Sequence, residues 1–226
     1  MVLNVIMLGP PGAGKGTQAE RFARAHGVPR ISTGDILRDG IEQGLPLARA
    51  KEKMNRGELV DDETMIGIVR ERLSRPDAAA GFVLDGFPRT VYQGRALDAI
   101  MAERATGPLI VVDIVVPLDE LVRRLSARRI CSTCGANADP ADSGSTTCRQ
   151  CGGALVTRTD DNERVVLERL RVYNDNTWPL VDFYRGRPTF RKVDGTQHAD
   201  RVAEELEAAI LEAGRVGAGR PLGAVK

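Results

Sequence analysis

A glycine-rich segment near the amino terminus carries the clearest chemical signal in the sequence. A hydrophobic run at residues 2–8 leads directly into Gly-Pro-Pro-Gly-Ala-Gly-Lys-Gly-Thr at residues 9–17. Glycines let main-chain N–H groups converge on an anion, a helix start adds partial positive charge, and Lys15 supplies a mobile cation. The pattern predicts a phosphate-binding loop rather than a plain strand–helix turn. Gly16 follows the lysine where a hydroxyl that grips Mg²⁺ usually stands, and Thr17 comes one position late.

A carboxylate closes a second apolar run, in Gly-Phe-Val-Leu-Asp-Gly-Phe-Pro-Arg at residues 81–89. The carboxyl ends of parallel strands are where such folds bind ligands, so we expect Asp85 to hold Mg²⁺ through water molecules. The alternative is that Asp85 caps the following helix. A further segment, Ser-Thr-Gly-Asp at residues 32–35, predicts the start of a helix capped by Ser32.

The four cysteines fall in two Cys-x-x-Cys pairs separated by thirteen residues: Cys131, Cys134, Cys148 and Cys151. A glycine follows each pair, and two such knuckles can present four thiolates in a tetrahedron, which suits Zn²⁺. Four protein ligands leave no open position for water, so we expect a structural site. Two disulfides, a redox pair, or Fe or Co in place of Zn²⁺ are the alternatives.

Short apolar runs alternate with helical periodicity along most of the chain. Strands are predicted at residues 2–8, 28–31, 82–85, 109–116 and 190–193, and helices at 15–25, 61–74, 90–103, 118–129, 160–184 and 198–211. The alternation predicts an α/β fold, a P-loop parallel sheet with helices on both faces. Residues 32–61 and 127–161 break the rhythm as inserts, which leaves a core of residues 1–31, 62–126 and 162–213. The Gly-rich residues 214–226 are expected to form a disordered tail.

Composition limits the classes of partner. The 226 residues carry a net charge of +1, so no global field attracts nucleic acid or an anionic membrane. No apolar stretch reaches membrane-spanning length, and the amino terminus lacks the pattern of a secretory signal. We therefore expect a cytoplasmic protein that binds neither nucleic acid nor membrane.

Taken in order, these motifs resemble those of the adenylate kinase family. The resemblance rests on residues 9–17, 31–35, 85–89 and the pair Asp160-Asp161, and it covers the chain up to the tail. It is closest to the bacterial form with a long, metal-bearing lid. It implies the reaction ATP + AMP ⇌ 2 ADP with Mg²⁺, a helical AMP-binding insert at residues 32–61, a lid with structural Zn²⁺ at 127–161, and a monomer.

The resemblance also implies roles for individual residues. ATP is expected to contact Gly12, Ala13, Gly14, Lys15, Gly16, Thr17, Arg128, Asn137, Ala138 and Gln197. AMP is expected to contact Thr33, Arg38, Glu58, Leu59, Val60, Gly86, Phe87, Pro88, Arg89, Gln93, Arg158 and Arg169. The catalytic set is expected to be Lys15, Asp85, Arg89, Arg124, Arg128, Arg158 and Arg169. Asn137 and Ala138 stand where the family commonly has a bulkier residue, which predicts looser selectivity for the donor base.

The expected mechanism is positioning and cation placement, because charge spreads over the oxygens of the transferring phosphoryl group. The AMP phosphate is already an anionic nucleophile and needs no general base. Two other functions stay open: another nucleoside monophosphate kinase, or a zinc-ribbon nucleic-acid-binding protein with a regulatory P-loop. The long lid argues against the first, and the charge balance argues against the second.

Overall fold

The computed structural model describes residues 2–43, 48–138, 144–158 and 162–218. At its centre lies a five-stranded sheet in the order β2-β3-β1-β4-β7, and every neighbouring pair is parallel. The strands are β1 (Leu3–Leu8), β2 (Arg30–Ser32), β3 (Gly81–Asp85), β4 (Leu109–Val115) and β7 (Phe190–Asp194). The predicted P-loop α/β class is therefore confirmed, and β2 begins two residues later than expected.

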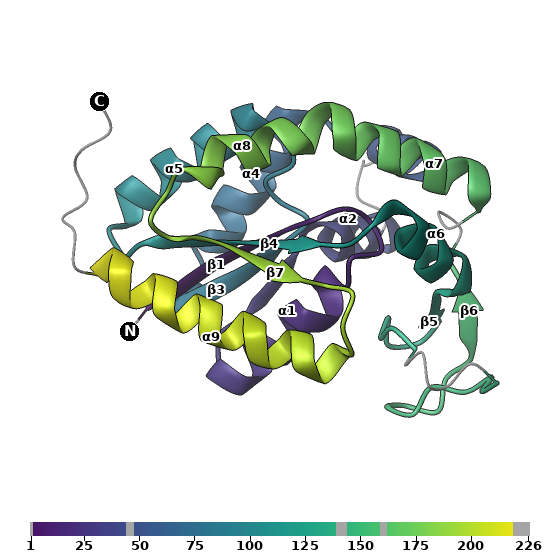
Figure 1. Cartoon of the computed structure of the whole chain (residues 1–226). Coiled ribbons are helices and arrows are strands. Elements are labelled where there is room, and N and C mark those ends of the chain that lie inside the picture. Colours follow the sequence, from purple (N-terminus) through teal and green to yellow (C-terminus); the bar gives the residue numbers. More distant parts are fainter. Residues whose placement is uncertain (1, 44–47, 139–143, 159–161, 219–226) are drawn as a thin grey trace.

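Helices cover both faces of the sheet, which explains why its strands read as unbroken apolar runs (Figure 1). All six residues of β1 are buried. On one face α1 (Lys15–His26) and α9 (Ala199–Ala218) pack against β1 and β4 in one hydrophobic cluster. On the other face the second cluster joins the sheet to α4 (Asp62–Leu73), α5 (Val91–Arg104) and α8 (Trp178–Arg185).

The strand register brings the predicted site residues to one edge of the sheet. Met7 of β1 pairs with Asp85 of β3, and Leu8 pairs with Asp113 of β4. The loop after β1 and the carboxyl end of β3 therefore emerge side by side. Two further helices stand at this end of the sheet, α6 (Leu118–Ala127) and α7 (Glu163–Val172) (Figure 1).

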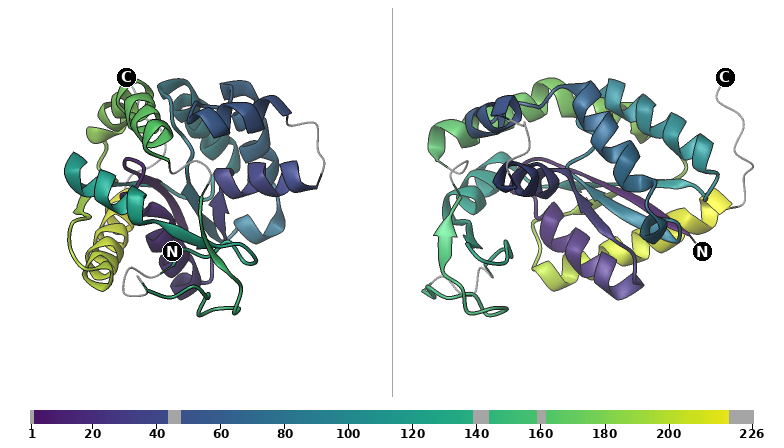
Figure 2. Two further views of the ribbon diagram at one scale, coloured as in Figure 1. Left: turned by 90° about the vertical axis from the view of Figure 1, so that its right-hand side faces the viewer. Right: turned by 180° about the vertical axis from the view of Figure 1, so that it is seen from behind.

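The first predicted insert packs on the core through Leu37 and Ala50, whereas the second lies outside the central sheet. Residues 32–61 form α2 (Thr33–Glu42) and α3 (Ala48–Arg56), and Ser32 caps α2 by accepting a hydrogen bond from the main chain of Asp35, as predicted. The second insert contains β5 (Arg129–Cys131) and β6 (Leu155–Thr157), which pair as a separate antiparallel sheet. Its ribbon projects from the core beyond α6 (Figure 2).

The helix predicted at residues 160–184 is broken in the structure. After α7, residues Tyr173–Thr177 form a π-helical segment, and α8 follows directly. Asp160 and Asp161 lie outside the described residues. Tyr173, the first residue of this segment, and Thr177, its last, are both buried.

The prediction of disorder from residue 214 is wrong for its first five residues, because α9 continues to Ala218. The reason is packing. A Cβ on Gly217 would lie 2.7 Å from the ring of Pro108, so the glycine lets the last turn of α9 settle closely on the loop before β4. Residues 219–226 lie outside the described part of the chain. Among the described helices, none is long and apolar enough to cross a membrane.

Candidate active site and metal centre

The predicted phosphate-binding loop joins the end of β1 to the start of α1. A Cβ on Gly9 would lie 2.6 Å from the carbonyl oxygen of Ile114, and its φ is +137°, so only glycine lets the loop pass this close to β4. Gly14 is the N-cap of α1 and has no capping side chain, which leaves the N–H groups of the first turn for an anion. The structure brings the predicted phosphate contacts together here: Gly12, Ala13, Gly14, Lys15, Gly16 and Thr17.

Lys15 folds back over this loop. Its Nζ donates hydrogen bonds to the carbonyl oxygens of Gly9 at 2.7 Å and Pro10 at 2.9 Å. Burial lowers the pKa of Lys15 to about 8, with Asp85 opposing the shift and Arg89, Arg169 and Arg128 adding to it. The charges of these three arginines therefore act on Lys15 in the same direction as burial.

Asp85 faces the first turn of α1. Its Oδ2 accepts a hydrogen bond of 2.9 Å from Nη2 of Arg30 in β2. A Cβ on Gly16 would lie 3.2 Å from that oxygen and 3.4 Å from the guanidinium. The absence of a side chain at Gly16 therefore lets Asp85 and Arg30 lie close to the first turn of α1. The capping alternative for Asp85 is excluded, since Thr90 caps α5 by accepting a hydrogen bond from the N–H of Gln93.

A cleft between α2, α3 and the sheet edge gathers most of the predicted acceptor-side residues. The empty space between its walls is about 620 Å³, its open mouth included. Its walls include the predicted residues Thr33, Arg38, Glu58, Leu59, Val60, Gly86, Arg89, Gln93, Arg158 and Arg169. Sequence reasoning missed the other wall residues, Gly34, Leu37, Met54, Gly57 and Met65.

Gly86 organises the floor of this acceptor cleft. Its carbonyl oxygen accepts hydrogen bonds from Thr33 Oγ1 at 3.0 Å and from Arg89 Nε at 2.7 Å. A Cβ on Gly86 would meet both side chains at 3.0 Å, and its φ is +84°, so glycine is required. Phe87 is only 1% exposed and packs in the core, so a contact from it to a ligand in the cleft would come from its main chain.

Gln93 is held in a fixed orientation at the wall of the acceptor cleft. Its Oε1 accepts from the N–H of Arg89 at 2.8 Å, and its Nε2 donates to Asp62 Oδ1 at 2.7 Å. The side chain is 2% exposed. The amide can still donate one hydrogen bond and accept one, and a purine edge offers partners for both.

A second cleft connects the acceptor cleft with the phosphate-binding loop. Its lining includes Gly9, Pro11 and Lys15 from the loop, Pro88, and Tyr173 and Thr177 from the π-helical segment. Gly57, Leu59, Gly86, Arg89 and Arg169 line both clefts. The two clefts therefore share a wall that carries two arginines.

The remaining predicted donor-side residues lie near the loop to different degrees. The amide nitrogen of Asn137 would lie 3.9 Å from a Cβ on Gly16, so this lid residue approaches the loop. Ala138 donates its N–H to Arg129 O, Arg124 Nε pairs with Glu120, and Gln197 Nε2 donates to Glu205. Arg124, Asn137, Ala138 and Gln197 do not line either cleft.

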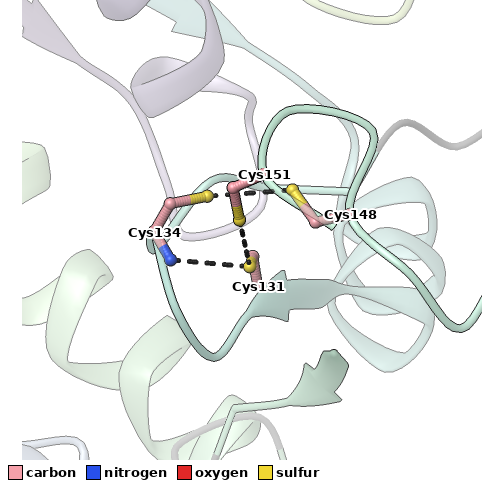
Figure 3. Close-up of side chains that lie close together, drawn as sticks. All are labelled: Cys131, Cys134, Cys148 and Cys151. Carbon is pink, nitrogen blue, oxygen red and sulfur yellow. Dashed lines mark hydrogen bonds between the residues drawn. The ribbon is translucent and has the colours of Figure 1, made fainter. Parts of the chain in front are cut away.

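The four cysteines form one cluster in the second insert, at the Cys131–Leu155 end of the β5–β6 pair (Figure 3). All four Sγ atoms lie within 4.8 Å of one another, with 3.4 Å between Cys131 and Cys151 and 3.7 Å between Cys134 and Cys148. A zinc ion with Zn–S bonds near 2.3 Å requires sulfurs about 3.8 Å apart in a tetrahedron. The geometry fits such an ion, and these separations exceed the disulfide length of about 2.05 Å.

In both Cys-x-x-Cys turns, main-chain N–H groups donate hydrogen bonds to the first cysteine's sulfur. Main-chain N–H groups of Thr133 and Cys134 donate to Cys131 Sγ at 3.4 and 3.5 Å, and Gln150 donates to Cys148 Sγ at 3.4 Å. The hydrogen bond from Cys134, followed by that from Thr133, lowers the pKa of the Cys131 thiol to about 6. In each pair the following glycine closes the turn at positive φ, 69° for Gly135 and 75° for Gly152.

Comparison with known proteins agrees with this geometry. The family model described as "Adenylate kinase" matches residues 7–189. The chain is 50% identical over 216 residues to an adenylate kinase of Archaeoglobus fulgidus, covering 93% of this chain and 98% of that protein. It is 48% identical over 210 residues to one from a Geobacillus species, covering 90% and 96%. This chain belongs to the adenylate kinase family.

Membership of the adenylate kinase family assigns a nucleotide-binding phosphotransferase activity, the reversible conversion of ATP and AMP to two ADP. The family assignment favours this activity over the two alternatives that the sequence left open. These were a different nucleoside monophosphate kinase and a zinc-ribbon nucleic-acid-binding protein. Kinases of this family use Mg-ATP, and the four cysteines are positioned to bind a metal.

Proposed function

We propose that this chain transfers the γ-phosphoryl group of Mg-ATP directly to AMP across the wall shared by its two clefts. The donor phosphates would lie on the loop at residues 9–17 and AMP in the acceptor cleft. The observation that carries the proposal is the position of Arg89 and Arg169, which line both clefts. A guanidinium there can contact donor and acceptor oxygens at once.

The chemistry follows from charge. The transferring group spreads negative charge over its equatorial oxygens, and preorganised cations stabilise that charge. The charges of Arg89, Arg169 and Arg128 each lower the pKa of Lys15. Arg38 and Arg158 add charge from the acceptor cleft. The acceptor phosphate is already an anion, so these residues need only orient it in line with the donor.

Two metals are part of the proposal. Asp85 stands at the carboxyl end of β3 beside the loop, which suits a water-mediated hold on Mg²⁺. Bound there, Mg²⁺ would neutralise charge on the donor phosphates. Cys131, Cys134, Cys148 and Cys151 would hold a structural Zn²⁺ that folds the small insert around it.

The two inserts would close over the nucleotides. We propose residues 32–61 as the AMP-binding insert and 127–161 as the lid, which brings Arg128, Arg158, Asn137 and Ala138 toward ATP. Arg124 and Gln197 would join on closure. Closure excludes water, which otherwise accepts the phosphoryl group. Both clefts are lined by one chain, so the proposed active form is a monomer. Four thiols that bind a metal suit a reducing compartment, the cytoplasm.

Initial rates with four acceptors test the proposal. With Mg-ATP as donor, AMP should be phosphorylated at least about a hundredfold more efficiently than CMP, UMP or GMP, with two ADP formed per AMP. Comparable kcat/KM for CMP or UMP would contradict the assignment of AMP to the acceptor cleft. Thermal unfolding should confirm that the protein is folded in each assay.

A further inference from the structure

Arg30 occupies an unusual place, because a single guanidinium joins three carboxylates beside the phosphate-binding loop. It lies 2.9 Å from Asp85, 3.0 Å from Asp35 and 4.0 Å from Glu20. The Arg30 side chain is 24% exposed and that of Asp85 13%, so water screens this pair only in part. Its Nε is buried and makes no hydrogen bond to any described residue. The fork is therefore fixed by its carboxylates.

The same guanidinium connects the donor and acceptor sides. Asp35 forms an ion pair with Arg30 through one oxygen and accepts a hydrogen bond from Arg38 with the other, and Arg38 lines the acceptor cleft. On the donor side, Arg30 holds Asp85, whose Oδ2 would lie 3.2 Å from a Cβ on Gly16. Arg30 thus stands between the carboxylate assigned to the metal and the arginine assigned to AMP.

We propose that Arg30 is a positioning residue that shares Asp85 with the divalent cation of the donor nucleotide and thereby weakens the protein's hold on that cation. The inference rests on the proposed role of Asp85 toward Mg²⁺. Arg30 Nη2 already occupies Asp85 Oδ2, so the cation can use only the remaining electron pairs of the carboxylate. The fixed positive charge also repels a dication held nearby.

The consequence is a compromise between two sites. Arg30 lowers the affinity for the metal, which favours release of the nucleotide–metal product. It also anchors Asp35, which in turn orients Arg38 toward the acceptor. Removing the guanidinium should therefore increase the affinity for the metal and decrease the affinity for AMP. A residue that only supported the fold would not move these two affinities in opposite directions.

The test measures metal binding directly. Electron paramagnetic resonance of free Mn²⁺ gives the affinity of the protein–ATP complex for Mn²⁺ without AMP. Arg30→Gln should tighten Mn²⁺ about tenfold and raise the KM for AMP several-fold, because a few ångströms separate the charges and solvent screens them in part. Arg30→Lys keeps the charge and should leave Mn²⁺ affinity within about twofold. Arg21→Gln, which removes the ion pair between Arg21 on α1 and Asp200 on α9, is the matched control and should change neither.

Asp85→Asn separates the two levels of the argument. If it does not weaken Mn²⁺ binding, the proposed role of Asp85 fails and the inference fails with it. If Asp85→Asn weakens Mn²⁺ binding but folded Arg30→Gln does not tighten it, the role of Arg30 alone is overturned. Should Arg30→Gln not fold, ¹⁵N NMR of the native protein–ATP complex decides. Mg²⁺ should shift the guanidinium signals of Arg30 but not of Arg21, and an unmoved Arg30 signal overturns the inference.

Discussion

Thr177 Oγ1 donates a hydrogen bond of 2.9 Å to the main-chain carbonyl of Arg89, which lies 88 residues earlier in the chain. The donor belongs to the π-helical segment between α7 and α8 and is 6% exposed. The acceptor stands at the wall shared by the two clefts. The irregular turn therefore fixes the backbone from which the Arg89 guanidinium extends, in keeping with the frequent location of π turns at functional sites.

Thr177→Val should weaken both stability and catalysis. Valine keeps the shape but leaves the Arg89 carbonyl without this donor, so the free energy of unfolding should fall by about 1 kcal/mol. The kcat/KM for AMP should fall about tenfold because Arg89 is less firmly positioned. Urea unfolding and steady-state kinetics measure the two effects. Thr189→Val, at a buried threonine away from the clefts, is the control, and an unchanged kcat/KM in folded Thr177→Val would contradict the positioning role.

Arg89→Lys should not preserve activity although it preserves charge. The guanidinium donates Nε to Gly86 O, its residue lines both clefts, and an ammonium cannot reproduce the planar fork. We expect kcat to fall by about 10³ or more, the scale of a lost arginine in phosphoryl transfer. Arg70→Lys, in the exposed pair with Glu103, should retain native kinetics. Activity within about twofold of native in Arg89→Lys would rule out bidentate recognition.

Lys15→Met should abolish most phosphoryl transfer and alter the pH dependence of stability in a defined direction. The folded-state pKa of about 8 lies below the ordinary 10.5, so between these values the unfolded chain holds more protons. Stability contributed by this group therefore rises with pH across that window, and below pH 8 the buried charge is a cost.

Chemical unfolding of both proteins from pH 7 to 10.5 provides the measurement. The Met variant should gain most over the native protein below pH 8, and its advantage should shrink toward pH 10.5. Other titrating groups are common to both proteins and cancel in the difference. A difference independent of pH would show that Lys15 is not desolvated, and native turnover in the folded variant would contradict the loop assignment.

Cys148→Ser should destabilise the lid and spare the core. The cluster lies outside both clefts, and the core has its own parallel sheet. Loss of one thiolate should lower the melting temperature of the insert more than that of the core, so unfolding should occur in two stages. Activity at low temperature should largely survive. Calorimetry and elemental analysis test this, with about one metal per native chain expected. Ser145→Ala, in the same insert, is the control.

Two results would contradict the structural metal. Native protein purified without chelator that carries four titratable thiols and no metal would refute the site. Loss of activity in Cys148→Ser at unchanged stability would refute its structural role.

The parts of the site carried by local motifs could be predicted from the sequence. The phosphate-binding loop, Asp85 and the cysteine knuckles each depend on residue types at fixed short spacings, because main-chain turns and metal geometry require them. The family resemblance then supplied the distant arginines. The fold class followed from buried strands alternating with amphipathic helices.

The features that could not be predicted from the sequence depend on packing between distant segments. Helical periodicity across residues 160–184 does not reveal one added residue per turn, so the π-helical segment and its bond to Arg89 were missed. Leu37, Met54 and Met65 look like ordinary core residues until the cleft is seen. The glycine-rich composition of residues 214–226 predicted disorder, yet the lack of a side chain at Gly217 is what lets α9 pack on Pro108.

Direct transfer between the two clefts is the central claim, and a single-turnover experiment tests it most directly. Enzyme in excess is mixed with ATP labelled in its γ-phosphate, Mg²⁺ and AMP, then quenched and separated. The label should pass into the β-phosphate of ADP formed from AMP, at the rate ATP disappears, with no labelled protein and no orthophosphate. A labelled protein formed and consumed at the turnover rate, or orthophosphate as the main labelled product, would contradict the account.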